Sequence, residues 1–243
     1  MIVYIRRLEI IIFFFLFNYV KIYPGDFMNT NYNLEMEKEI DKIKEDGIVP
    51  TLLLHSCCGP CSTCCIERLS DYFKITVFYY NPNIYPEEEY YKRKEVELDF
   101  IKKYTSKYKI EFLDCDYEPE KFNEIAKGYE KCKEGEERCY KCYNLRLDET
   151  AKVAKENEFD YFTTTLSVSP HKNSKWINEI GLELEKKYNI KYLPSDFKKK
   201  DGYKRSIELC KKYCLYRQNY CGCIYSLYER LEQEKNKEEN ISI

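Results

Sequence analysis

Thiols are the side chains of this sequence best suited to chemistry, because its thirteen cysteines are bunched rather than scattered. Five lie within nine residues, in the run His-Ser-Cys-Cys-Gly-Pro-Cys-Ser-Thr-Cys-Cys that begins at His55. The other closely spaced cysteines are the Cys-x-x-Cys pair Cys139 and Cys142 and the Cys-Gly-Cys pair Cys221 and Cys223. Cysteine used only as a small buried side chain has no reason to cluster. The pattern therefore indicates metal binding or redox chemistry.

The first group of cysteines allows three kinds of chemistry. Cys58-Gly-Pro-Cys61 has the spacing of a thioredoxin-like dithiol, in which one thiol attacks a disulfide and the other resolves it. Together with Cys139 and Cys142, the group could instead supply four thiolates to a zinc ion or to a 4Fe-4S cluster. The vicinal pair Cys57-Cys58 favours the cluster over zinc, because adjacent cysteines reach different irons of a cluster more naturally.

The remaining cysteines divide into a redox candidate and packing residues. Cys221-Gly-Cys223 favours a redox-active disulfide, since such a closely spaced bridge is strained and labile, with metal ligation as the alternative. The cysteines expected to serve only in packing are Cys64, Cys65, Cys115, Cys132, Cys210 and Cys214.

Two polar segments could bind a substrate. The loop Ser167-Val-Ser-Pro-His-Lys-Asn contains His171, a candidate proton donor or phosphate contact, and Lys172. Residues 198–217 carry eight Lys and Arg side chains against two acids, with three interleaved tyrosines. Such a run is ordinarily a solvated helix face, but it also suits single-stranded RNA, through phosphate contacts and base stacking. Its candidate binding residues are Lys204, Arg205 and Arg217.

Alternating β-rich and helical segments must position these groups. We expect strands at Thr51–His55, Lys74–Tyr80, Ile110–Leu113, Tyr161–Thr165 and Ile190–Leu193. We expect helices from Pro60 through Tyr72 and at Glu87–Tyr108, Pro119–Gly128, Tyr140–Asn157 and Trp176–Tyr188. Strands separated by helices predict an α/β fold with a mainly parallel sheet and helices on both faces, Rossmann-like or HUP-like, plus a helical C-terminal part. Cys57 and Cys58 would then follow the first strand, in the crevice where open α/β sheets bind ligands.

The domain organisation follows from composition. A net charge of −2 and 44% hydrophobic residues describe a globular chain, so a nucleic acid would have to meet a local basic face. Residues 1–27 are expected to form an N-terminal appendage. Their apolar run is shorter than the ~20 residues of a membrane-spanning helix, so they resemble either a weak membrane anchor or a segment that precedes the true start of the protein. Residues 28–230 are expected to form one catalytic α/β domain, and 231–243 a charged tail. The odd cysteine count fits a reducing cytoplasm.

Several motifs together resemble one enzyme family. They are LLLHSCCGPCST, YYNPNIYPEEEYYKRK, DYEPEKF, RCYKCYNLRL, TTLSVSPHKNSKWIN and KRSIELCKKYCLYRQNYCGCIYS, which span roughly Pro50 to Leu227 in order. They resemble the cobalamin-independent epoxyqueuosine reductases, which reduce the epoxide of a modified base at the wobble position of tRNA in the last step of queuosine synthesis. The appended residues 1–27 are not part of that pattern.

The resemblance implies an assignment of the cysteines. It implies a 4Fe-4S cluster held by Cys57, Cys58, Cys139 and Cys142, and a redox-active disulfide of Cys221 and Cys223. It also implies a second metal, a mononuclear iron, with Cys61 and Asp116 as its candidate ligands. The implied partners are tRNA carrying epoxyqueuosine in the anticodon loop and an unidentified electron donor, with no stable membrane partner. A thiol–disulfide oxidoreductase of Cys58 and Cys61, or a zinc-stapled RNA-binding module, remain the alternatives.

Overall fold

A five-stranded parallel sheet forms the centre of the protein. The computed structural model describes residues 30–241, with side chains from 30 to 237. The strands are β1 (Thr51–His55), β2 (Lys74–Phe78), β3 (Glu111–Leu113), β4 (Tyr161–Thr164) and β5 (Lys191–Tyr192). They pair in the order β3-β2-β1-β4-β5, and every pair is parallel. The predicted mainly parallel α/β sheet is therefore confirmed.

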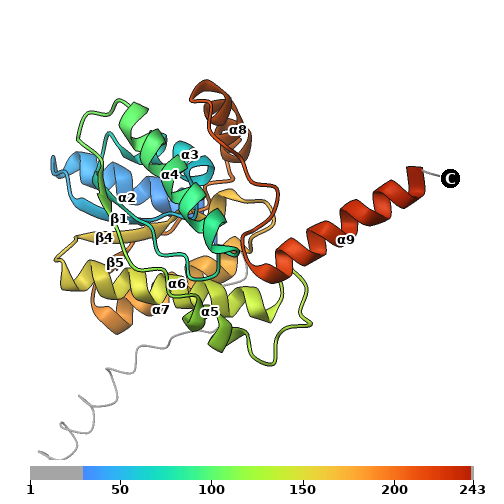
Figure 1. Cartoon of the computed structure of the whole chain (residues 1–243). Coiled ribbons are helices and arrows are strands. Elements are labelled where there is room, and N and C mark those ends of the chain that lie inside the picture. The colour runs from blue at the N-terminus through green and yellow to red at the C-terminus, as the bar shows by residue number, and fades with distance from the viewer. Residues whose placement is uncertain (1–29, 242–243) are drawn as a thin grey trace, which may run out of the picture. The chain divides into compact units, whose positions relative to one another are not determined.

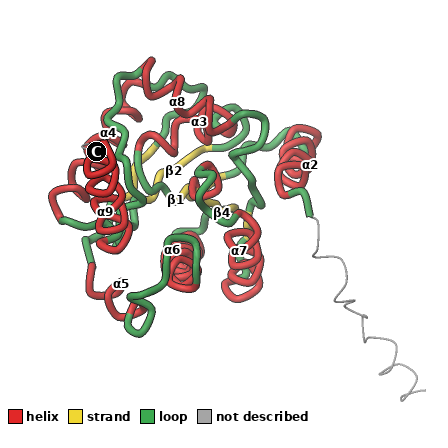
Figure 2. Tube along the Cα trace, turned by 90° about the vertical axis from the view of Figure 1, so that its right-hand side faces the viewer, coloured by secondary structure: helices red, strands yellow, loops and turns green. Residues whose placement is uncertain are grey.

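Helices cover both faces of this sheet (Figures 1 and 2). One face packs against α2 (Tyr32–Glu45), α3 (Gly59–Leu69), α4 (Glu87–Lys103) and α8 (Gly202–Lys212). The other packs against α6 (Glu137–Glu156) and α7 (Ser174–Tyr188), and α5 (Pro119–Ala126) packs on α6. Successive side chains of a strand point to opposite faces, so Leu52 and Leu54 belong to the first core and Leu53 to the second. α8 and α9 (Ile224–Ile241) form the predicted helical C-terminal part.

Local sequence signals place the helix ends near the cysteines. Cys58 is extended and α3 begins at Gly59, with Pro60 in the first turn, where its missing N–H is not needed. α6 begins at Glu137, three residues before the expected Tyr140, so Cys139 lies in its first turn. α7 begins after Asn173, whose side chain accepts hydrogen bonds from two main-chain N–H groups of the first turn.

The chain termini lie partly outside the described residues. The N-terminal appendage expected at residues 1–27, and its reading as a weak anchor, fall outside them. The main compact unit begins at Tyr32. Within the described part of the chain, no helix combines the length and the apolar character needed to cross a membrane. The boundary expected between residues 230 and 231 stays a prediction, and α9 runs across it.

Candidate active site

Buried polar side chains join the carboxyl ends of three strands beneath the cysteines. At the end of β1, His55 Nδ1 lies 2.8 Å from the Thr164 hydroxyl of β4. His55 Nε2 lies 3.1 Å from the carbonyl oxygen of Tyr80, which follows β2. Burial is the main cause that lowers the pKa of His55 to about 3, so the imidazole is neutral. His55 therefore fixes the strand ends that carry the site.

Three thiols converge where β1 leads into α3. The sulfurs of Cys57, Cys58 and Cys61 all lie within 4.8 Å of one another, and those of Cys57 and Cys58 are 3.8 Å apart. Hydrogen bonds from Cys58 and Cys61 hold the pKa of the Cys57 thiol well below its ordinary value. The same contact with Cys57 raises the pKa of Cys58 to about 12. One thiolate with two thiol donors is a group that a metal ion can bind.

The second cysteine pair lies on α6, on the opposite side of the sheet from α3. Cys139 packs in the same buried cluster as Cys57 and Cys58, whereas Cys142 packs with Cys223. The sulfurs of Cys139 and Cys142 are not in the 4.8 Å group formed by the described residues. Burial is the main cause that raises the pKa of Cys139 to about 11 and that of Cys142 to about 12. The structure therefore brings the pair to the same region without closing a four-thiol set.

Two buried cations lie among these sulfurs. Arg146 is 2% exposed and Lys172 is 8% exposed, and neither forms an ion pair with a carboxylate of the described residues. Burial lowers the pKa of Lys172, but electrostatic interaction with the neighbouring sulfurs of Cys221, Cys57 and Cys61 more than offsets this and leaves the pKa well above its usual value. A buried cation requires a nearby negative charge. Thiolates that carry an anionic iron–sulfur cluster would supply it, so the residues present fit that group.

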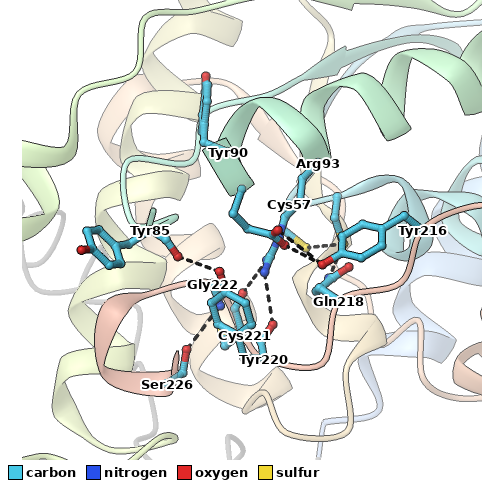
Figure 3. A network of polar contacts seen from close by, with 12 residues as sticks. Cys57, Tyr85, Tyr90, Arg93, Tyr216, Gln218, Tyr220, Cys221, Gly222 and Ser226 are labelled. Atoms are coloured by element: carbon cyan, nitrogen blue, oxygen red, sulfur yellow. Dashed lines mark hydrogen bonds and ion pairs between the residues drawn. The ribbon is translucent and has the colours of Figure 1, made fainter. Parts of the chain in front are cut away.

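The Cys-Gly-Cys segment is held in place by Arg93 of α4 (Figure 3). The guanidinium donates to the carbonyl oxygens of Cys221, at 3.0 Å, and Tyr220, at 3.5 Å, and it forms a 2.7 Å ion pair with Glu89. Gly222 has φ of +135°, and a Cβ there would lie 3.0 Å from the Arg93 guanidinium. Only glycine fits this backbone conformation and this close approach. Cys221 and Cys223 form no disulfide in this structure, and neither do the other described cysteines.

A cavity of about 540 Å³ opens between these segments. Cys57, Cys61 and Cys221 line it, so the thiol group and the Cys-Gly-Cys segment face one space. Among the predicted substrate-binding residues, the cavity wall includes His171, Lys172 and Arg217. The wall also contains residues of α8, α9 and the loops, among them Glu134, Tyr203, Gln218, Asn219, Tyr220 and Glu229.

Seven predicted site residues are not part of this cavity wall: four cysteines, Cys58, Cys139, Cys142 and Cys223, and the three polar residues Asp116, Lys204 and Arg205. Arg205 forms a bidentate pair with Glu67, at 2.8 Å for both nitrogens, and a further contact with Glu208. Lys204 is exposed on α8, and Asp116 is exposed after β3. The roles assigned to these three residues stay predictions. The expected packing role of Cys64, Cys65 and Cys210 agrees with their burial, whereas Cys214 is exposed.

Four polar residues of the site were not expected from the sequence. They are Arg93, Glu97, Arg146 and Gln218. Arg93 and Glu97 share a buried face of α4 with Tyr90 and Phe100. Their helical spacing from these aromatics was the available signal, because charged residues that repeat in phase with buried positions face the core. Gln218 carried no comparable signal.

The sequence of this chain is similar to proteins of one known family. The family model for the epoxyqueuosine reductase QueH matches residues 52–229. A QueH of Streptococcus pyogenes is 43% identical over 81% of this chain and 78% of its own length. A QueH of Staphylococcus epidermidis is 44% identical over 81% of this chain and 84% of its own length. A QueH of Thermotoga maritima is 37% identical over 75% and 93%. All the cysteines that converge on the cavity lie within the matched residues, and the chain belongs to the epoxyqueuosine reductase QueH family.

Proposed function

We propose that this chain reduces epoxyqueuosine to queuosine at the wobble position of tRNA, in the last step of queuosine biosynthesis. Membership of the QueH family supports an oxidoreductase of this pathway. The observation that carries the proposal is the convergence of Cys57, Cys61, Cys221 and Lys172 on one cavity. Reductive opening of an epoxide can use a dithiol as the source of electrons, thiols that bind a metal, and a buried cation that stabilises the charge on the oxygen.

The two thiols of the Cys-Gly-Cys segment can supply the number of electrons that the reaction consumes. Conversion of an epoxide to an alkene and water consumes two electrons and two protons. Oxidation of the Cys221 and Cys223 thiols to a disulfide releases two electrons and two protons, so one dithiol balances one epoxide. An external electron donor, which we leave unidentified, must then reduce the disulfide. The two sulfurs are close in sequence around Gly222, whose conformation lets the chain turn between them.

Cys57, Cys58, Cys139 and Cys142 are the proposed ligands of a 4Fe-4S cluster. Their burial, their common region and the two cations nearby support this set. When bound, the cluster would supply one-electron transfer between dithiol and substrate. Cys61 is the proposed ligand of a second, mononuclear iron, since its sulfur lies beside Cys57 and lines the cavity. Asp116 remains only a predicted second ligand.

Lys172 is the proposed contact of the reacting oxygen. Its buried ammonium lines the cavity beside Cys57 and Cys221. A cation in a region of low dielectric stabilises negative charge that develops on the epoxide oxygen, and Nζ can donate a proton to it. Single-stranded anticodon nucleotides can turn a base into a pocket. His171 and Arg217 in the cavity wall would then bind the phosphates on either side of that base.

The alternative functions have less support. A thioredoxin-like attack by Cys58 needs an accessible sulfur, but Cys58 is fully buried. A structural zinc site, which only stabilises the fold, does not require thiols that line a cavity. We place the reaction in the cytoplasm, where reduced thiols and tRNA occur together.

Anaerobic reconstitution with iron and sulfide tests the proposal. The protein is incubated with a reductant and tRNA carrying epoxyqueuosine, and the nucleosides are analysed by mass spectrometry. We expect queuosine to form and the protein to show broad brown absorbance. Cys139→Ala and Cys142→Ala should lose both the absorbance and the conversion, whereas Cys214→Ala, at an exposed cysteine, should keep both. Conversion by a colourless, iron-free protein would contradict the cluster.

A further inference from the structure

Gln218 connects the Cys-Gly-Cys segment to the group of three thiols. It lies three residues before Cys221 and lines the cavity. Its side-chain Nε2 donates a hydrogen bond to the Cys58 sulfur at 2.9 Å. That bond is the only side-chain hydrogen bond of Gln218 among the described residues, because Oε1 is buried without a partner.

The unpaired Oε1 makes Gln218 unfavourable for folding alone. A buried acceptor left unpaired costs about 1–3 kcal/mol, so folding alone favours an apolar residue at this position. The amide N–H points to one sulfur, and an N–H donor stabilises negative charge on the atom that accepts from it. Arg93 adds a positive charge near Cys58 while it holds the carbonyl of Cys221.

We propose that Gln218 is a positioning residue that fixes the Cys58 sulfur and raises the reduction potential of the metal group bound there. The inference rests on the proposed function, in which Cys58 is a cluster ligand. Hydrogen bonds to the sulfurs are one of the determinants of iron–sulfur potentials. The reduced form carries the more negative charge, so an N–H donor stabilises it more than the oxidised form. The same side chain keeps Cys221 close to the site that exchanges electrons with it.

A redox titration of the reconstituted protein, followed by electron paramagnetic resonance, tests this role. Gln218→Leu removes the N–H donor and puts an apolar side chain of similar size in its place. Gln218→Glu replaces the donor with a carboxylate. We expect the reduction equilibrium to shift at least tenfold toward the oxidised form in Gln218→Leu, about 59 mV for one electron, and further in Gln218→Glu. Gln233→Leu makes the same change on α9 and should leave the potential unchanged. A Gln218→Leu potential equal to wild type would overturn the proposal.

A second measurement needs neither metal nor activity. The chain has two glutamines, Gln218 and Gln233, so selective ¹⁵N labelling gives two side-chain amide signals. In the apoprotein, Cys58→Ala should shift the Gln218 signal and speed its hydrogen exchange while leaving the Gln233 signal in place. An unchanged Gln218 signal would refute the sulfur contact even if a variant fails to take up iron. Failure of the wild-type protein to bind iron would instead count against the proposed function, and this comparison would still decide whether Gln218 contacts the Cys58 sulfur.

Discussion

The Arg93 guanidinium donates a 3.0 Å hydrogen bond to the main-chain carbonyl of Cys221, which lies 128 residues further along the chain. Arg93 is 1% exposed and forms an ion pair with Glu89 on the same helix. The guanidinium also lies over the aromatic ring of Tyr220, 4.8 Å from the ring centroid, and this is a second contact with the segment. A buried cation of α4 therefore holds the Cys-Gly-Cys segment, together with a 2.8 Å hydrogen bond from the Tyr85 N–H to the carbonyl oxygen of Gly222.

Arg93→Ala should destabilise the protein strongly, because it leaves two carbonyl groups without their donor and removes the cation paired with Glu89, which keeps only the hydrogen bonds from the Tyr216 hydroxyl. Loss of one member of a buried ion pair costs about 3–5 kcal/mol. The control is Lys103→Ala on the same helix, whose ion pair with Asp99 is exposed and contributes about 0.3–0.5 kcal/mol. Urea unfolding of the apoprotein measures both. If Arg93→Ala loses no more stability than Lys103→Ala, the guanidinium does not hold the segment.

Cys221→Ser should separate cluster binding from turnover. Serine cannot form the disulfide that balances epoxide reduction, so the variant should bind iron normally and fail to turn over repeatedly. Iron content and steady-state formation of queuosine measure the two properties. Cys214→Ser changes an exposed cysteine in the same way and should behave as wild type. Full steady-state activity of Cys221→Ser would rule out the dithiol role.

Glu97 should make stability depend on pH. Burial is the main cause that raises its pKa from 4.5 to about 7, and the charge of Cys57 adds to this effect. Between these values folded Glu97 keeps its proton while the unfolded chain loses it, so stability falls as pH rises from about 4.5 to about 7. Glu97→Gln cannot ionise. It should therefore gain stability relative to wild type, on the order of 3 kcal/mol, between pH 4.5 and 8.

Urea unfolding of the apoproteins at several pH values measures the difference between wild type and Glu97→Gln. Glu95→Gln, at an exposed position of the same helix, is the matched control. A difference between wild type and Glu97→Gln that stays constant with pH would show that Glu97 ionises in the folded protein as it does in the unfolded chain.

Arg217 and Arg205 should differ in their effect on tRNA binding. Arg217 lines the cavity, with its guanidinium over the Tyr203 ring, whereas Arg205 is paired with Glu67 and Glu208. A guanidinium already paired with carboxylates neutralises less phosphate charge. Arg217→Ala should weaken binding more than Arg205→Ala and reduce the slope of log K against log salt by about one. Filter binding across a salt series measures both. Equal losses would place the RNA on the outer face of α8 as well.

The cysteine spacing and the strand–helix alternation could be read from the sequence because both are local. Pro60 and the β-rich run before it placed Cys57 and Cys58 between β1 and α3, as the structure has them. Periodicity was less reliable on α4. The helix expected at Glu87–Tyr108 carries the apolar residues Val96, Leu98, Phe100 and Ile101 at helical spacing, but of these only Phe100 is buried, on the same face as Arg93 and Glu97. Tertiary partners decided that face, since a charged side chain can be buried wherever another segment satisfies it.

The sequence by itself determined which residue types could do chemistry, the parallel α/β fold and the family that the motifs resemble. Those properties depend on spacing along the chain. Only the tertiary structure decided that Cys57, Cys61 and Cys221 share a cavity and that His171, Lys172 and Arg217 line it while Arg205 is paired elsewhere. It also revealed the Gln218 contact with Cys58. Contacts between residues more than a hundred positions apart arise from packing around the sheet, which no local pattern encodes.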